Sequence, residues 1–274
     1  DSHYILVNYE ETWDVLQYNV YSTQYDRLTG TILSIFDAVD GESKFAAIFS
    51  TRVGRSNLLQ NLLENYVYFS YNNNNPQKSD KTIHDFMAFM DKPNASNIII
   101  NHLSVLAQAA PKIVVDALKA EMKKTNGIIM SLFNHPQQSD SRYMNILFAL
   151  DKLTFYSESA VPACRILFRL YQTDQNKFRD SNSPYSSLLN ALCFINTYFP
   201  FPIKRKVELL LNFLKKDSYN GGKLIVGILN KDEISISSPY GRIGQYHETS
   251  LSYEEYYHAA EQIVEPCLQH FNQL

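Results

Sequence analysis

The chain of 274 residues is 45% hydrophobic and 19% charged, and its formal net charge is −3. This composition is typical of a globular protein and excludes a collagen-like chain, a disulfide-stapled miniprotein and a disordered charged tail. The near-neutral charge argues against a nucleic-acid partner, and the sequence has no apolar run of about 18 residues that would predict a membrane span.

Residues 1–93 are predicted to be a helical part that contains one polar loop. The spacing of apolar residues predicts helices over residues 28–39 and 58–69. The asparagine-rich stretch 71–82 has no such spacing, and we expect it to form the loop.

Residues 94–230 are predicted to form regular helix pairs. We expect Ser96 to cap a helix that ends at Pro111, where a second helix begins and runs to Gly127. Further helices are expected to begin near Ser141, Ser159, Pro184 and Pro202.

The end of this part carries two further patterns. The helix after Pro202 has a predicted buried stripe made of Val207, Leu210, Leu211 and Leu214. Residues 223–229 fit a helix or a strand. The preceding Asn220-Gly221-Gly222 predicts a turn at a helix end, because the spacing of a phosphate-binding loop is missing.

Residues 231–274 are predicted to be a long loop, 231–251, followed by a C-terminal helix. Ser252 and Glu255 have the spacing of a capping box. Pro266 predicts a kink or a break within the helix. Its predicted buried side consists of Tyr256, Ala260, Ile263, Val264 and Phe271.

The predicted helix pairs recur at a nearly constant displacement. The pair that begins at Ser141 and Ser159 recurs at Pro184 and Pro202, 43 residues later in both cases, and the preceding pair begins 45 residues earlier, at Ser96. Repeats of about 40–47 residues with two helices each are typical of HEAT and armadillo proteins. We therefore predict an all-α fold, an α-solenoid of stacked helical hairpins of the HEAT, armadillo or TPR type.

The chain start and the cysteines bear on the origin of the chain. It opens Asp1-Ser2-His3 without an initiator methionine, so we expect residues 1–274 to be a single helical-repeat domain at the C-terminal end of a longer protein. Its three distant cysteines, Cys164, Cys193 and Cys267, indicate buried, reduced thiols in a cytoplasmic protein.

The sequence has no P-loop, nucleophile elbow, zinc-protease motif or paired-cysteine motif, and its seven histidines are scattered. We therefore predict no catalytic, cofactor-binding or metal-binding residue and do not expect this chain to be an enzyme.

Two places are candidates for contact with a protein partner. In the loop 231–251 they are Tyr240, Arg242, Tyr246 and His247, because Arg and Tyr often anchor interfaces, although a loop of this length favours a structural brace. In the basic run 204–206, which lies near further lysines, they are Lys204 and Arg205. The alternatives for this run are an anion-binding site or a solvated helix face.

Several segments resemble, in the same order, the C-terminal helical region of large bacterial STAND-type NTPases of antiphage defence. Residues 103–111 resemble the "LLAEAAP" turn of that group. The other similar segments are Asn182, Pro184, Ser187 and Leu188 ("NRPxxSL"), Phe199-Pro200-Phe201 ("LPW"), and Ser237-Ser238-Pro239, Arg242 and Tyr253-Glu254-Glu255-Tyr256 ("SSPxxRxR…xxEYW"). The sequence departs from the pattern at Ser183, Phe201, Gly244 and Tyr257.

The resemblance implies a non-catalytic sensor module whose longer parent protein is an NTPase. Such a module would contact the upstream domains of its own chain and would bind a phage-encoded protein, which triggers the NTPase and its effector. Two alternatives remain open. One is an enzyme whose site near the 231–251 loop uses His247, Glu248, Tyr240 and Arg242, and the other is a self-association scaffold.

Overall fold

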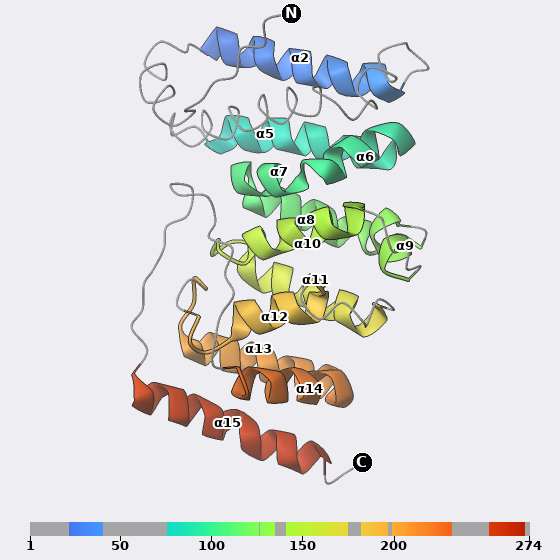
Figure 1. Ribbon diagram of the computed structural model, residues 1–274. Helices are drawn as coiled ribbons and strands as arrows, with labels where there is room; N and C mark the ends of the chain where they lie inside the picture. Colours follow the sequence, from blue (N-terminus) through green and yellow to red (C-terminus); the bar gives the residue numbers. More distant parts are fainter. Residues whose placement is uncertain are drawn as a thin grey trace, which may run out of the picture. The chain divides into compact units, whose positions relative to one another are not determined.

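The computed structural model describes residues 22–40, 76–125, 127–134, 141–174, 182–196, 199–231 and 252–271, and all secondary structure in these ranges is helical (Figure 1). The predicted all-α fold class is confirmed for these residues. In chain order, the helices are α2 (Ser22–Asp40), α5 (Pro76–Met87), the 3₁₀-helix η2 (Ala88–Asp91), α6 (Pro93–Asn101), α7 (Leu103–Ala109), α8 (Pro111–Glu121), α9 (Ile128–Asn134), α10 (Ser141–Leu153), α11 (Ala160–Thr173), α12 (Pro184–Leu192), α13 (Ile203–Lys216), α14 (Ser218–Leu229) and α15 (Tyr253–Phe271).

The chain divides into two compact units, Asp1–Val114 and Val115–Leu274. The boundary lies inside α8, whereas the internal divisions expected from the sequence lie at residues 93 and 230. The helices α9 to α15 belong wholly to the second unit.

In the first unit, α2 packs against α6, and α5 contacts η2 and α7. The helix α2 includes residues 28–39, so this predicted helix is confirmed. Its side chains Tyr25 and Ile32 are buried and lie on one face, because two helical turns separate them. The predicted helix over 58–69 lies outside the described residues.

The predicted polar loop 71–82 is wrong over residues 76–82, which form the first half of α5. Pro76 occupies the first helical position, where its fixed φ favours the helix and its missing N–H costs nothing. The buried side chains Ile83 and Phe86 then hold the helix against its neighbours, and this burial outweighs the polar composition of the first turns. Residues 71–75 lie outside the described part of the chain.

The helix predicted to begin at Ser96 begins earlier and is broken. Lys92 is the N-cap of α6 and Pro93 stands in its first turn, so the buried Ser96 lies inside the helix. The chain leaves helical geometry at His102 (φ −110°, ψ 9°), the single residue between α6 and α7. His102 is buried, and burial lowers its pKa to about 4. A neutral imidazole therefore separates α6 from α7 at neutral pH.

The second unit contains the helix pairs that the sequence predicts. The helices α10 and α12 begin at Ser141 and Pro184, and α11 and α13 begin at Ala160 and Ile203, so both displacements are 43 residues. The displacement does not extend to the preceding pair, since α6 begins at Pro93, 48 residues before Ser141. An additional helix, α9, lies between α8 and α10 in chain order and was not expected from the sequence.

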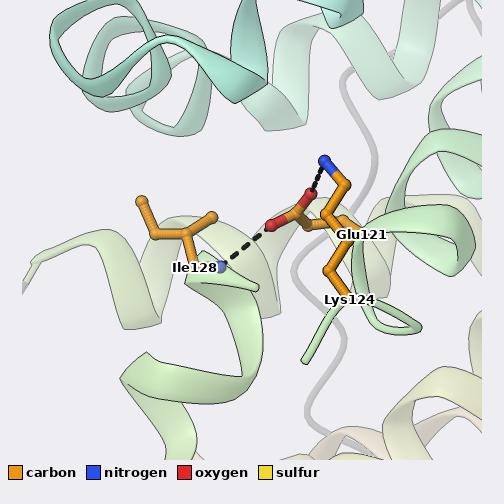
Figure 2. A network of polar contacts seen from close by, with 3 residues as sticks. All are labelled: Glu121, Lys124 and Ile128. Carbon is orange, nitrogen blue, oxygen red and sulfur yellow. Dashed lines mark hydrogen bonds and ion pairs between the residues drawn. The ribbon is translucent and has the colours of Figure 1, made fainter. Parts of the chain in front are cut away.

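A buried carboxylate joins α8 to α9 (Figure 2). One oxygen of Glu121 accepts a hydrogen bond from the backbone N–H of Ile128 at 2.9 Å, and the other pairs with the ammonium group of Lys124 at 2.5 Å. The turn between them needs Gly127, because a Cβ atom there would lie 2.6 Å from the carbonyl oxygen of Glu121. Two short-range polar contacts and one glycine therefore fix this connection.

The helix α13 packs against both α14 and α15, and this double contact widens its buried face. Leu209 and Leu210 are both buried, whereas Leu211 of the predicted stripe is only half-buried. Phe213 stacks on Phe168 of α11 with ring centroids 4.2 Å apart and an interplanar angle of 3°. The predicted stripe is therefore correct at its other three residues and wrong at Leu211.

The glycine pair before residue 223 lies inside α14, so the predicted helix-ending turn is wrong. The Asp217 carboxylate caps α14 by accepting a hydrogen bond from the backbone N–H of Asn220 at 3.0 Å. A Cβ atom on Gly221 would lie 2.5 Å from the Cα of Leu214. Gly221 therefore allows the backbones of α13 and α14 to approach closely, and residues 223–229 are helical.

The last helix begins as predicted. The Ser252 hydroxyl accepts a hydrogen bond from the backbone N–H of Glu255 at 3.1 Å, and the Glu255 carboxylate accepts one from the backbone N–H of Ser252 at 3.0 Å. The capping box is therefore confirmed. The helix continues through Pro266 to Phe271 without a break.

We predict that Gly221→Ala lowers the free energy of unfolding by about 1–3 kcal/mol, because the new methyl group must displace the α13 backbone. Gly30→Ala, in α2, is the matched control. A Cβ atom on Gly30 would have no other atom within 4 Å. This control should raise stability by up to about 1 kcal/mol through helix propensity. Urea unfolding followed by circular dichroism measures both, and a stabilising Gly221→Ala would contradict the close approach.

Candidate functional site

The structure describes only two of the predicted partner-contact residues. Lys204 and Arg205 are exposed in the first turn of α13. The Arg205 guanidinium pairs with the Glu208 carboxylate of the next turn at 2.5 Å. Tyr240, Arg242, Tyr246 and His247, together with Glu248, lie outside the described residues.

The third member of the basic run, Lys206, does not share the surface of Lys204 and Arg205. Its side chain is buried, and its ammonium group donates hydrogen bonds to the carbonyl oxygens of Cys193 at 2.8 Å and Asn196 at 2.5 Å. These carbonyls follow the C-terminal end of α12, where a cation is favourable. Burial lowers the pKa of Lys206 to about 8. The run 204–206 is therefore not one basic patch.

We predict that Lys206→Met changes the pH dependence of stability. The ordinary pKa of Lys206 is 10.5 and its folded pKa is about 8, so between these values the unfolded chain binds the proton and the folded chain does not. Wild-type stability should therefore rise relative to that of the variant, by up to about 3 kcal/mol, between pH 8 and 10.5. Urea unfolding at a series of pH values measures this difference.

Lys204→Met, at an exposed position on the same helix, is the control and should leave stability within about 0.5 kcal/mol across that pH range. If the difference in stability between wild type and Lys206→Met were the same at all pH values, the lowered pKa of the buried Lys206 would be contradicted.

A second polar contact joins α10 to α12 through the half-buried Asp151. Burial raises the pKa of Asp151 to about 6. Two smaller effects lower this pKa: the hydrogen bond that the Ser187 hydroxyl donates to the carboxylate, and the positive charge of the neighbouring Lys152. Burial also raises the pKa of the Cys164 thiol to about 12, so it stays protonated and unreactive at neutral pH. The pKa shifts of Asp151 and Cys164, like that of Lys206, thus have burial as their largest cause.

We predict that Asp151→Asn stabilises the protein near pH 7 by about 1–3 kcal/mol. The folded pKa of about 6 lies above the ordinary value of 3.8, so the native state loses stability as the pH rises through this range. The amide keeps a neutral acceptor for the Ser187 hydroxyl. Thermal unfolding at pH 7 and pH 3 tests this: the gain should be absent at pH 3, and an equal effect at both pH values would refute it.

The exposed large apolar side chains gather on the last two helices of the second unit. Among the described residues, seven such side chains are exposed, and only Phe148 of α10 lies elsewhere. The other six are Tyr219 and Val226 of α14 and Tyr253, Tyr257, Val264 and Leu268 of α15. Exposed apolar side chains concentrated on two contacting helices are typical of interaction surfaces.

The helix α15 packs one side against α13 and α14 (Figure 1). A second side of the helix carries exposed apolar residues. The buried side chains of α15 are Ala259, Ile263 and Cys267. Of the predicted buried side, Ile263 is buried, Tyr256 and Ala260 are only half-buried, and Val264 is 38% exposed, so the prediction is correct at Ile263 alone. The side chain of Phe271 lies outside the described part. This second side was not predicted from the sequence, although its apolar residues have helical spacing there.

In the described ranges, no group of three or more His, Cys, Asp or Glu side chains is placed to hold a metal ion. In the same part of the chain, no helix is both long enough and apolar enough to cross a membrane. The cysteines Cys164, Cys193 and Cys267 are free and buried, as predicted.

Comparison of the chain with protein-family models, curated proteins and solved structures gives no match.

Proposed function

We propose that this chain is a non-catalytic protein-recognition module. The observation that carries the proposal is the concentration of exposed apolar side chains on α14 and α15. Tyr253, Tyr257 and Tyr219 are 86%, 64% and 68% exposed, and tyrosine is a side chain that often anchors protein interfaces. Burying them against a partner would release bound water and favour association.

The helix pairs support a solenoid as the framework of this module. The pairs α10–α11 and α12–α13 repeat with one displacement, and α11 contacts α12. A stack of helical hairpins of the HEAT, armadillo or TPR type presents a long surface to a large partner. In the proposed function, this framework holds α14 and α15 in place for binding.

The sequence resemblance supports a more specific role for this module, as the sensor of a bacterial antiphage STAND-type NTPase. The similar segments lie where helices start or turn: residues 103–111 cover α7 and the start of α8, and Asn182 and Pro184 lie at the start of α12. In this proposal the chain acts in the cytoplasm and binds a phage-encoded protein. Binding then favours the active state of the upstream NTPase in the parent protein.

Capture with the whole 274-residue chain tests the proposed function. Lysates of phage-infected and uninfected bacteria are passed over the immobilised chain, and bound proteins are compared by mass spectrometry. We expect one phage-encoded protein to be enriched from infected cells and, once purified, to bind the chain with a defined stoichiometry in calorimetry.

Repeated captures without a specific phage protein would count against the proposed function. Light scattering on the same sample separates it from the scaffold alternative, because self-association into a defined oligomer would favour scaffolding instead.

A further inference from the structure

The exposed apolar side of α15 forms a continuous stripe, which we call the α15 stripe. It consists of Tyr253, Tyr257, Ala260, Val264 and Leu268, with Ala260 half-buried and the other four exposed. At a rotation of about 100° per residue, the five side chains fall within an arc of about 80° and extend over about 22 Å. Apolar residues with this spacing form the face by which one helix packs on another.

A row of carboxylates borders the α15 stripe. Glu254, Glu261 and Glu265 are exposed, and the same rotation places them in an arc of about 40° directly beside the stripe. The helix contains four glutamates and neither lysine nor arginine. The other border of the stripe is the side of α15 that packs against α13 and α14. A partner on the stripe therefore meets negative charge along its free edge.

We propose that the α15 stripe binds an amphipathic helix whose apolar side is flanked by lysine or arginine. The spacing of the stripe fits the apolar side of a helix, and its acidic border complements basic flanks. This proposal rests on the proposed function, since it states the kind of segment that the module recognises.

The same charges disfavour two other occupants. A second copy of the chain would bring the same row of glutamates against itself, and like charges in contact oppose association. An anionic lipid surface would meet the carboxylates of Glu254, Glu261 and Glu265 and be repelled. A basic helix is the occupant for which both the apolar and the charged parts of the surface are favourable.

Three synthetic peptides of about 18 residues, long enough to cover the stripe, test the proposal on the whole chain. The first has a leucine stripe flanked by lysines, the second has the same stripe flanked by glutamates, and the third has the composition of the first in scrambled order. Fluorescence anisotropy of labelled peptides measures binding. We expect the first to bind at least about tenfold more tightly than the others, and increasing salt to weaken its binding.

Two variants of the chain locate the bound peptide. Val264→Asp places a charge in the stripe and should weaken binding of the lysine-flanked peptide by about tenfold or more. The double change Glu261→Lys and Glu265→Lys should reverse the preference toward the glutamate-flanked peptide. Phe148→Asp, on the exposed surface of α10 and outside the α14 and α15 set, is the control and should leave binding unchanged. Circular dichroism verifies that each variant folds, which is expected because all the changed side chains are exposed.

Several outcomes would overturn the proposal. Equal binding of the lysine-flanked and scrambled peptides would show attraction by charge alone, and unchanged binding by Val264→Asp would place the peptide elsewhere. A dimer of the chain that Val264→Asp abolishes would make a second copy the occupant. Binding to anionic vesicles that the same variant abolishes would make the occupant a lipid surface.

The proposal and the proposed function fail in different ways. If a captured phage protein binds wild type and Val264→Asp equally well, the function stands and the α15 stripe is not its site. If the lysine-flanked peptide binds as expected but no phage protein is captured, the stripe is a helix-binding surface and the sensor function is wrong.

Discussion

The packing of α13 is the constraint on which the rest of the second unit depends. This helix contacts α14 and α15, and its Phe213 stacks on Phe168 of α11. Its buried leucines each contribute about 1.5–3 kcal/mol by leaving water. Its close contact with α14 requires Gly221, and its Lys206 binds the carbonyls that follow α12. A shift of α13 would therefore disturb four neighbouring helices at once.

The unusual ionisable groups of the unit result from this packing. Burial is the largest cause of the pKa shifts of Asp151, Cys164 and Lys206, and each of these groups belongs to a helix in the packed pairs. Shifted pKa values often mark catalytic sites, but a group enclosed by apolar helices is also shifted when it only stabilises or destabilises the fold. These pKa shifts therefore do not support the proposed function, which rests instead on the exposed apolar side chains of α14 and α15.

Helix starts were predictable from the sequence where the signal is local. The capping hydrogen bonds of Ser183 with Ser186 and of Ser252 with Glu255 join residues three positions apart, so the sequence alone contains both partners. The all-α class and the 43-residue displacement depend on such local signals together with apolar periodicity. At Lys92 and Pro93, a proline in the first turn decided the start of α6 and the serine further on did not.

Features that depend on contacts between residues far apart in the sequence were not predictable. Gly221 resembles a turn residue until α13 is placed against it, and Lys206 resembles a surface cation until the end of α12 supplies its acceptors. The same applies to the candidate surface: periodicity finds apolar residues on α15, but only the positions of α13 and α14 decide which of them are buried. Val264 was assigned to the wrong side for this reason.

The three buried cysteines report when helices of the second unit separate locally. Cys164 lies in α11, Cys193 directly follows α12, and Cys267 lies in α15, and each is at most 6% exposed. A thiol reagent reaches such a sulfur only when the surrounding helices separate, so its rate of modification measures the free energy of that local opening. Three sites in one chain thus distinguish fraying of the last helix from opening of the central pairs, without any introduced label.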